Sequence, residues 1–119
     1  MILITGPYSS PDAEVKAARV KTIATACAAL IIQTNQVAMS PLLSGLAIIE
    51  KSGKKLPDNT EFWKEFCRVF VRAAEEVYVL DMDGWDKSGG VADEINEAKE
   101  RNIPVYLVHR HTLNFIKVL

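Results

Sequence analysis

The 119-residue sequence has little of several features that mark particular classes of protein. It holds only two cysteines, Cys27 and Cys67, which suggest neither a disulfide scaffold nor a zinc site. Its formal net charge is −1, so no basic surface is expected to neutralise a nucleic-acid backbone. We therefore expect a reducing, cytoplasmic location and no nucleic-acid partner.

Long apolar runs are also missing. The opening Met-Ile-Leu-Ile-Thr-Gly is too short for a signal peptide, and no run approaches the roughly 20 residues of a membrane-spanning helix. No membrane partner is therefore expected. With 49% hydrophobic residues the chain can bury one ordinary core, so we expect a single domain over residues 1–119.

The apolar residues that are present alternate between strand-like and helix-like spacing. Short apolar runs predict strands at residues 2–5, 37–40 and 76–80 and another ending at residue 108, with a short strand or helix at 115–118. Helical spacing predicts helices at about 13–32, 42–51 and 60–73, the last with its aromatic side chains mostly in the core, and a fourth after Gly90. Residues 52–59 are expected to form a loop. This order predicts an α/β fold, a three-layer flavodoxin-like or Rossmann-like parallel sheet with helices on both faces.

The segment from Trp85 to Ile95 carries the strongest functional signal. It leads through Gly89 and Gly90 into a helix that is expected to hold Glu94 in about its first turn. A helix start offers free N–H groups and partial positive charge, which favour a bound phosphate and an ionised carboxylate. The lysine of a Walker motif and the third glycine of a dinucleotide motif are missing, so a plain strand-to-helix connection is the competing interpretation.

Two other loops are expected beside this segment. Gly6-Pro7-Tyr8-Ser9 follows the first predicted strand, Ser40 follows the second, and residues 81–90 follow the third. Ligands bind beyond the carboxyl ends of parallel strands, so we expect these loops to line one crevice into which Glu94 points.

These residues resemble the nucleoside 2-deoxyribosyltransferase-like superfamily over nearly the whole chain. The likeness is carried by Ile4-Thr5-Gly6-Pro7-Tyr8-Ser9, Ser40-Pro41, Phe62-Trp63, Gly84-Trp85 and the pattern Ser-x-Gly-Val-x-x-Glu at residues 88–94. The chain is most similar to small bacterial and phage members of unknown role, and more distantly to the 2'-deoxynucleoside 5'-phosphate N-hydrolases.

The resemblance implies hydrolysis of the N-glycosidic bond of a (2'-deoxy)nucleoside 5'-monophosphate, without a cofactor or metal. Glu94 takes the place of the nucleophile that forms a glycosyl-enzyme intermediate, and its ionisation is expected to be easy at a helix start. Ser88 matches the serine that contacts the 5'-phosphate in the nucleotide hydrolases, whereas the nucleoside transferases have an aspartate there. The substrate-binding residues implied or expected are Gly6, Tyr8, Ser88, Gly89, Gly90 and Trp85. A small-molecule nucleotide or nucleoside partner and a homodimer or larger homo-oligomer follow from the same likeness.

One position departs from the family pattern. Family members commonly carry an Asp on the helix before the central strand that helps to handle the proton of the departing base, and Cys67 stands in its place. Asp81 or Asp83 could supply the acid, the substrate could have a good leaving group, or the protein could be a nucleotide-binding sensor without turnover. Base exchange between deoxynucleosides is a further alternative, which Ser88 disfavours. His109 and His111 lack a Cys or carboxylate at ligand spacing and are expected at the surface or an interface.

Overall fold

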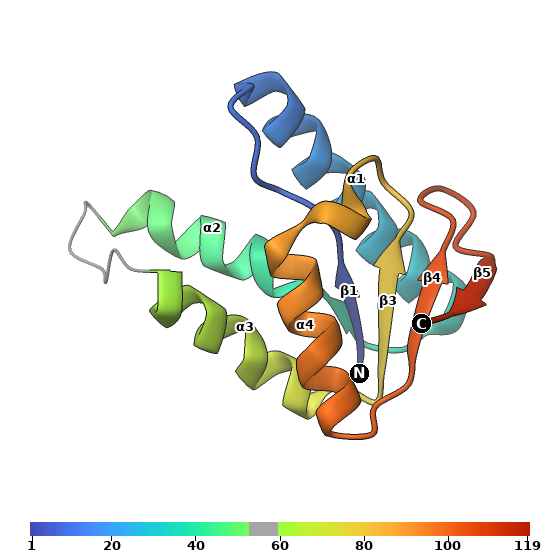
Figure 1. Cartoon of the computed structure of the whole chain (residues 1–119). Coiled ribbons are helices and arrows are strands. Elements are labelled where there is room, and N and C mark those ends of the chain that lie inside the picture. The colour runs from blue at the N-terminus through green and yellow to red at the C-terminus, as the bar shows by residue number, and fades with distance from the viewer. Residues whose placement is uncertain (53–59) are drawn as a thin grey trace.

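The computed structural model describes residues 1–52 and 60–119, which form the expected α/β architecture (Figure 1). In chain order the elements are β1 Ile2–Thr5, α1 Ala13–Thr34, β2 Ala38–Met39, α2 Pro41–Lys51, α3 Thr60–Ala73, β3 Glu76–Leu80, the 3-10 helix η1 Trp85–Lys87, α4 Gly89–Glu100, β4 Val105–Val108 and β5 Phe115–Val118. The predicted helices and strands are confirmed. Beyond Ser52, the loop predicted at residues 52–59 lies outside the described residues.

The five strands form one sheet in the order β2-β1-β3-β4-β5. β1 pairs in parallel with both β2 and β3, and β3 pairs in parallel with β4. β5 runs antiparallel to β4, because the short connection after Val108 allows a turn but not the crossover of a dozen or more residues that a parallel strand requires. The sheet is therefore mostly parallel.

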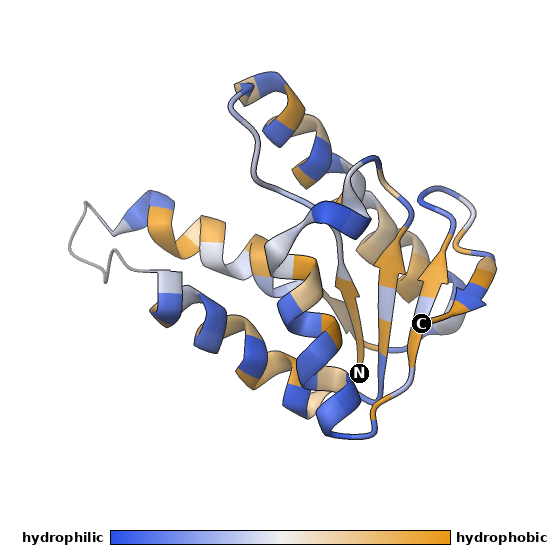
Figure 2. Cartoon of the chain, viewed as in Figure 1, coloured by the Kyte–Doolittle hydropathy of each residue, from blue (hydrophilic) through white to orange (hydrophobic). Residues whose placement is uncertain are grey.

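Helices cover both faces of this sheet. Ile4 packs in a core cluster with Ile23 and Leu30 of α1, whereas its neighbour Leu3 packs in a second cluster with Val71 of α3 and Val91 of α4. Successive strand residues point to opposite faces, so a strand that is buried on both faces has no polar alternation. Figure 2 accordingly shows apolar colour along most of the central strands.

Helix α1 extends beyond the sheet at its start. The Asp12 carboxylate caps it by accepting a hydrogen bond from the Glu14 N–H at 2.8 Å. Its buried residues, Ile23, Ala26, Cys27 and Leu30, all lie from the midpoint of the helix onward. Only that half of α1 contributes to the core.

The aromatic residues of α3 do not lie mostly in the core, contrary to prediction. Phe62 is 41% exposed, and Trp63, Phe66 and Phe70 are half-buried. They pack in sequence along the helix, with ring centroids 4.9 to 5.3 Å apart. The reason is that α2 and α3 extend together away from the sheet, and only the end of α3 reaches the core, at Val71 (Figure 1).

None of the helices in residues 1–52 and 60–119 combines the length and the apolar character needed to cross a membrane.

Candidate active site

A cavity of about 290 Å³ opens beyond the carboxyl end of β1, between α3 and the start of α4. The described residues that line it are Thr5, Gly6, Tyr8, Ser9, Leu42, Thr60, Trp63, Lys64, Cys67, Ser88, Gly90, Asp93 and Glu94. Five of the site residues that the resemblance implies therefore lie together in this lining: Gly6, Tyr8, Ser88, Gly90 and Glu94. Ser40 is buried outside this lining, and Leu42 of α2 takes the expected place of the second loop.

Glu94 forms part of the cavity wall and is only 7% exposed. Its Oε2 atom is fully buried and has no hydrogen-bond partner among the described residues. Ser88 is the N-cap and α4 begins at Gly89, so Glu94 lies in the second turn of the helix and not in the first. A buried carboxylate oxygen without a donor is unusual in a folded protein, which marks Glu94 as a candidate functional residue.

Burial raises the pKa of Glu94 from 4.5 to about 7. Hydrogen bonding by the Thr5 hydroxyl and the Cys67 thiol lowers this pKa, and the nearby charge of Asp93 raises it. The prediction of easy ionisation at a helix start is therefore wrong. The favourable field of a helix fades within its first turn, and the loss of water around the carboxylate outweighs what remains of it.

Cys67 lies on α3, where the resemblance expects an acid, and its thiol lines the cavity beside the carboxyl group of Glu94. Burial raises the pKa of its thiol to about 12, and the negative charges of Glu94 and Asp93 raise it as well. The thiol therefore keeps its proton at neutral pH. It can donate a weak hydrogen bond to Glu94 but is a poor proton donor to a leaving base.

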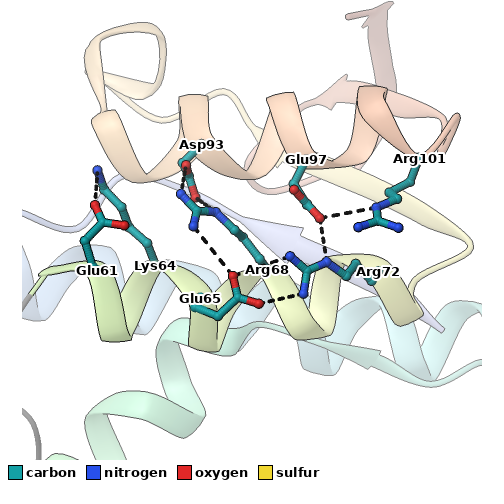
Figure 3. A network of polar contacts seen from close by, with 8 residues as sticks. All are labelled: Glu61, Lys64, Glu65, Arg68, Arg72, Asp93, Glu97 and Arg101. Atoms are coloured by element: carbon teal, nitrogen blue, oxygen red, sulfur yellow. Dashed lines mark hydrogen bonds and ion pairs between the residues drawn. The ribbon is translucent and has the colours of Figure 1, made fainter.

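Ion pairs fix α3 against α4 around these two residues (Figure 3). The guanidinium of Arg68 makes two hydrogen bonds to the carboxylate of Asp93, at 2.8 and 3.1 Å. Arg72 makes 2.6 Å contacts with both Glu65 and Glu97. Arg68 directly follows Cys67 and Asp93 directly precedes Glu94, so the two-bond pair holds the thiol and the carboxylate beside each other.

The start of α4 forms another wall. The Ser88 hydroxyl accepts a hydrogen bond from the Val91 N–H at 3.3 Å, and a Cβ added to Gly89 would meet no atom within 4 Å. A second hollow, of about 440 Å³, shares Ser88 and Gly90 with the first and adds Gly89 and Lys87. Lys64 lines both hollows and forms an ion pair with Glu61 at 3.7 Å. Helix N–H groups and two lysines thus make this end of the site suitable for an anion.

Residues 1–110 match the model of a family described as a domain of unknown function, DUF1937. The chain belongs to DUF1937. The matched range includes every described residue that lines the two hollows. No curated protein sequence matched the chain.

In this DUF1937 domain, Trp85 lies in η1 and packs against the core cluster that contains Val91. It is not among the described residues that line either hollow. Trp63, the other tryptophan, lines the cavity instead. The structure therefore offers Trp63, not Trp85, as the aromatic surface next to a ligand.

Asp81 and Asp83 of the DUF1937 domain lie elsewhere. Asp81 accepts a hydrogen bond from the Arg110 backbone N–H at 2.7 Å and pairs with the Arg110 side chain. Asp83 lines a separate hollow beside Arg19 and Arg110. Neither carboxylate lines the cavity of Glu94, so the structure does not support the idea that one of them replaces the acid.

His109 of the DUF1937 domain lies in a turn. The Nδ1 atom of His109 accepts hydrogen bonds from the backbone N–H groups of His111 and Thr112, at 3.1 Å each. Within the described ranges, no group of three or more His, Cys, Asp or Glu residues is placed to share a metal ion.

The sequence did not indicate Thr5, Lys64 or Lys87 as site residues. Thr5 ends a strand, and both lysines look like ordinary surface charges. Only the packing of α3 against α4 brings Lys64 to the cavity. Trp63 was part of the resemblance, but nothing in the sequence showed which tryptophan faces the ligand.

Proposed function

We propose that the protein hydrolyses the N-glycosidic bond of a (2'-deoxy)nucleoside 5'-monophosphate, with Glu94 as the nucleophile. The observation that carries the proposal is the buried Glu94 carboxyl group in the cavity wall, whose Oε2 atom has no partner among the described residues. Because Glu94 lines the cavity, its carboxyl group lies where it can meet the anomeric carbon of a bound sugar. The resemblance of residues 88–94 to the pattern around a glycosidase nucleophile supports the same role.

Burial suits this chemistry because it leaves the Glu94 carboxylate poorly hydrated. A transition state with oxocarbenium character is positively charged, so the ionised carboxylate stabilises it more strongly than it stabilises the neutral sugar. The Thr5 hydroxyl and the Cys67 thiol lower the pKa of Glu94 and thereby help to keep it ionised. Attack of the carboxylate on the anomeric carbon breaks the carbon–nitrogen bond, releases the base and gives a glycosyl ester, which water then opens.

The anion-binding end of the site fits a 5'-monophosphate. Ser88, Gly89 and Gly90 open α4 with a hydroxyl and free helix N–H groups, and Lys64 and Lys87 line the same hollow. If the phosphate of the nucleotide binds there, its base points toward α3. The aromatic ring of Trp63 lines that side of the cavity.

We expect the purified protein to release free base from at least one nucleoside 5'-monophosphate. Because Glu94 must be ionised to attack and its pKa is raised to about 7, kcat/KM should rise about tenfold per pH unit below 7 and level off above it. Liquid chromatography of reactions with a panel of ribonucleotides and 2'-deoxynucleotides, run at several pH values, measures the released base and the pH dependence of kcat/KM. Release of no base from any member of the panel would overturn the proposal.

Ser88→Ala is expected to weaken both α4 and phosphate binding. Loss of the N-cap should reduce the free energy of unfolding by about 1 kcal/mol, and the KM for a monophosphate should rise several-fold while kcat changes little. Asp12→Ala is the matched control, because it removes the N-cap of α1, away from both hollows. Urea unfolding and steady-state kinetics give the two quantities. An equal KM for Ser88→Ala and Asp12→Ala would show that Ser88 does not contact the phosphate.

A second candidate function is nucleotide binding without turnover. It is favoured by Cys67, whose thiol stays protonated where the resemblance expects an acid. Thermal-shift measurements with the same nucleotide panel separate the two functions: a raised Tm without any release of base supports a binding protein.

A further inference from the structure

The described lining of the cavity contains two carboxyl groups, Glu94 and Asp93. Glycosidases that act on a poor leaving group use one carboxylate at the anomeric carbon and a second carboxyl group to protonate the departing atom. Glu94 performs the attack in the proposed function. Asp93 receives two hydrogen bonds from the guanidinium of Arg68, which engages both of its carboxylate oxygens and turns them toward α3.

The other polar groups of this lining are weaker acids than a carboxyl group. The Cys67 thiol faces Glu94 and keeps its proton, because burial and two nearby negative charges oppose the thiolate. The ammonium group of Lys64 is paired with Glu61. The remaining polar side-chain groups of the described lining are the hydroxyl groups of Thr5, Tyr8, Ser9, Thr60 and Ser88 and the indole N–H of Trp63. The described part of the site therefore has a nucleophile but only weak acids to protonate a neutral base.

We propose that the substrate is a nucleoside 5'-monophosphate whose base is already positively charged, such as an N7-alkylated purine or a pyridinium. This inference rests on the proposed function and names its substrate class. One Glu94 oxygen forms a bond to the anomeric carbon as the carbon–nitrogen bond breaks. The electron pair of that bond neutralises the ring, and the base leaves without needing a proton. Water then attacks the same carbon, Glu94 departs as a carboxylate, and the proton from the water passes to the solvent.

The walls of the cavity match the two charges of such a substrate. Trp63 lines the side near α3, and aromatic faces attract cationic rings. The carboxylates of Asp93 and Glu94 add negative charge near the sugar. Lys87 and the start of α4 line the second hollow, where they favour the phosphate.

The test compares two nucleotides that differ by one methyl group and its charge, guanosine 5'-monophosphate and 7-methylguanosine 5'-monophosphate, together with their 2'-deoxy counterparts. Nicotinamide mononucleotide is a third probe with a pyridinium base. After subtraction of the rate without enzyme, kcat/KM should be about 100-fold or more higher for the methylated member of each pair, the usual contribution of a general acid.

Two substitutions at Cys67 make the test specific. Cys67→Asp adds a carboxyl group where the resemblance expects one, and it should raise kcat/KM on the neutral nucleotide and shrink the ratio between the pair at least tenfold. Cys67→Ser keeps the group neutral, so the ratio should stay large. Circular dichroism checks that both variants fold.

The possible outcomes separate this inference from the proposed function. Efficient release of guanine with no preference for the methylated base would overturn the inference and leave the proposed function standing. Release of base from none of the probes would overturn both. A large preference that is equally large in Cys67→Asp would show that the missing acid is not its cause, and the inference would again fail.

Discussion

Glu94→Gln is expected to reduce the release of base by at least about 10³-fold while making the protein more stable at alkaline pH. Gln has nearly the shape of Glu, so the cavity is kept, but its amide cannot form the glycosyl ester. Loss of activity follows from the proposed chemistry, and the gain in stability follows from burial. Substitution of a residue that only supported the fold would lower the stability of the protein and leave the catalytic rate of the folded protein nearly unchanged.

The gain in stability depends on pH in a defined direction. The pKa of Glu94 rises from 4.5 in the unfolded chain to about 7 in the folded protein, so the folded state binds the proton more tightly. The stability contributed by the protonated group is complete below pH 4.5 and is lost as pH rises through about 7. At pH 8 the native protein has lost roughly 3 kcal/mol of its free energy of unfolding in this way. The Glu94→Gln variant has no carboxyl group to ionise at this position, so its free energy of unfolding does not fall for this reason.

Urea unfolding of the native protein and the variant at pH 5 and pH 8 measures this difference, since other titrating groups cancel between the two. Glu97→Gln is the matched control on the same helix. Glu97 is also buried, but it is paired with Arg72 and Arg101, so its substitution should lower stability at both pH values. Equal effects of pH on the native protein and on Glu94→Gln would contradict the account of burial.

Leu3→Ala and Ile4→Ala are each expected to lower the free energy of unfolding by about 2–5 kcal/mol. The two residues are adjacent in β1 and point to opposite faces of the sheet, and both are completely buried. The effects should be similar because helices cover both faces. Ile116→Ala in β5 is the control, since Ile116 is 50% exposed and its loss should cost less than about 1 kcal/mol.

Chemical unfolding of the three variants gives these values. A small effect at either Leu3 or Ile4, with the other large, would mean that one face of the sheet is open and that the three-layer arrangement is wrong.

The order of elements was predictable because strands and helices have different apolar spacing. The apolar run that follows Glu76 in β3 indicated a strand that is buried on both faces, and the structure has it between β1 and β4. The direction of β5 was not predicted, since the sequence at residues 115–118 carries no sign of orientation. The prediction that the aromatic residues of α3 lie mostly in the core was wrong for a related reason. Apolar spacing shows which face of a helix is apolar but not which element covers that face.

The candidate site was only partly predictable. The positions of Gly6 and Ser88 beside Glu94 follow from the rule that loops at the carboxyl ends of parallel strands meet. The raised pKa of Glu94 could not be foreseen, because it depends on how completely α3 covers the carboxyl group. The same packing selects Trp63 over Trp85 and brings Lys64 to the site.

The stereochemistry of the reaction is the most direct test of whether Glu94 is the nucleophile. Two successive displacements at the anomeric carbon, through an ester of Glu94, must return the sugar to its starting configuration. With methanol present as a competing acceptor, the methyl glycoside formed from a β-nucleotide does not interconvert between anomers and can be assigned by nuclear magnetic resonance. We expect the β-methyl glycoside, and formation of the α-anomer would show that the acceptor attacks directly and that Glu94 is not the nucleophile.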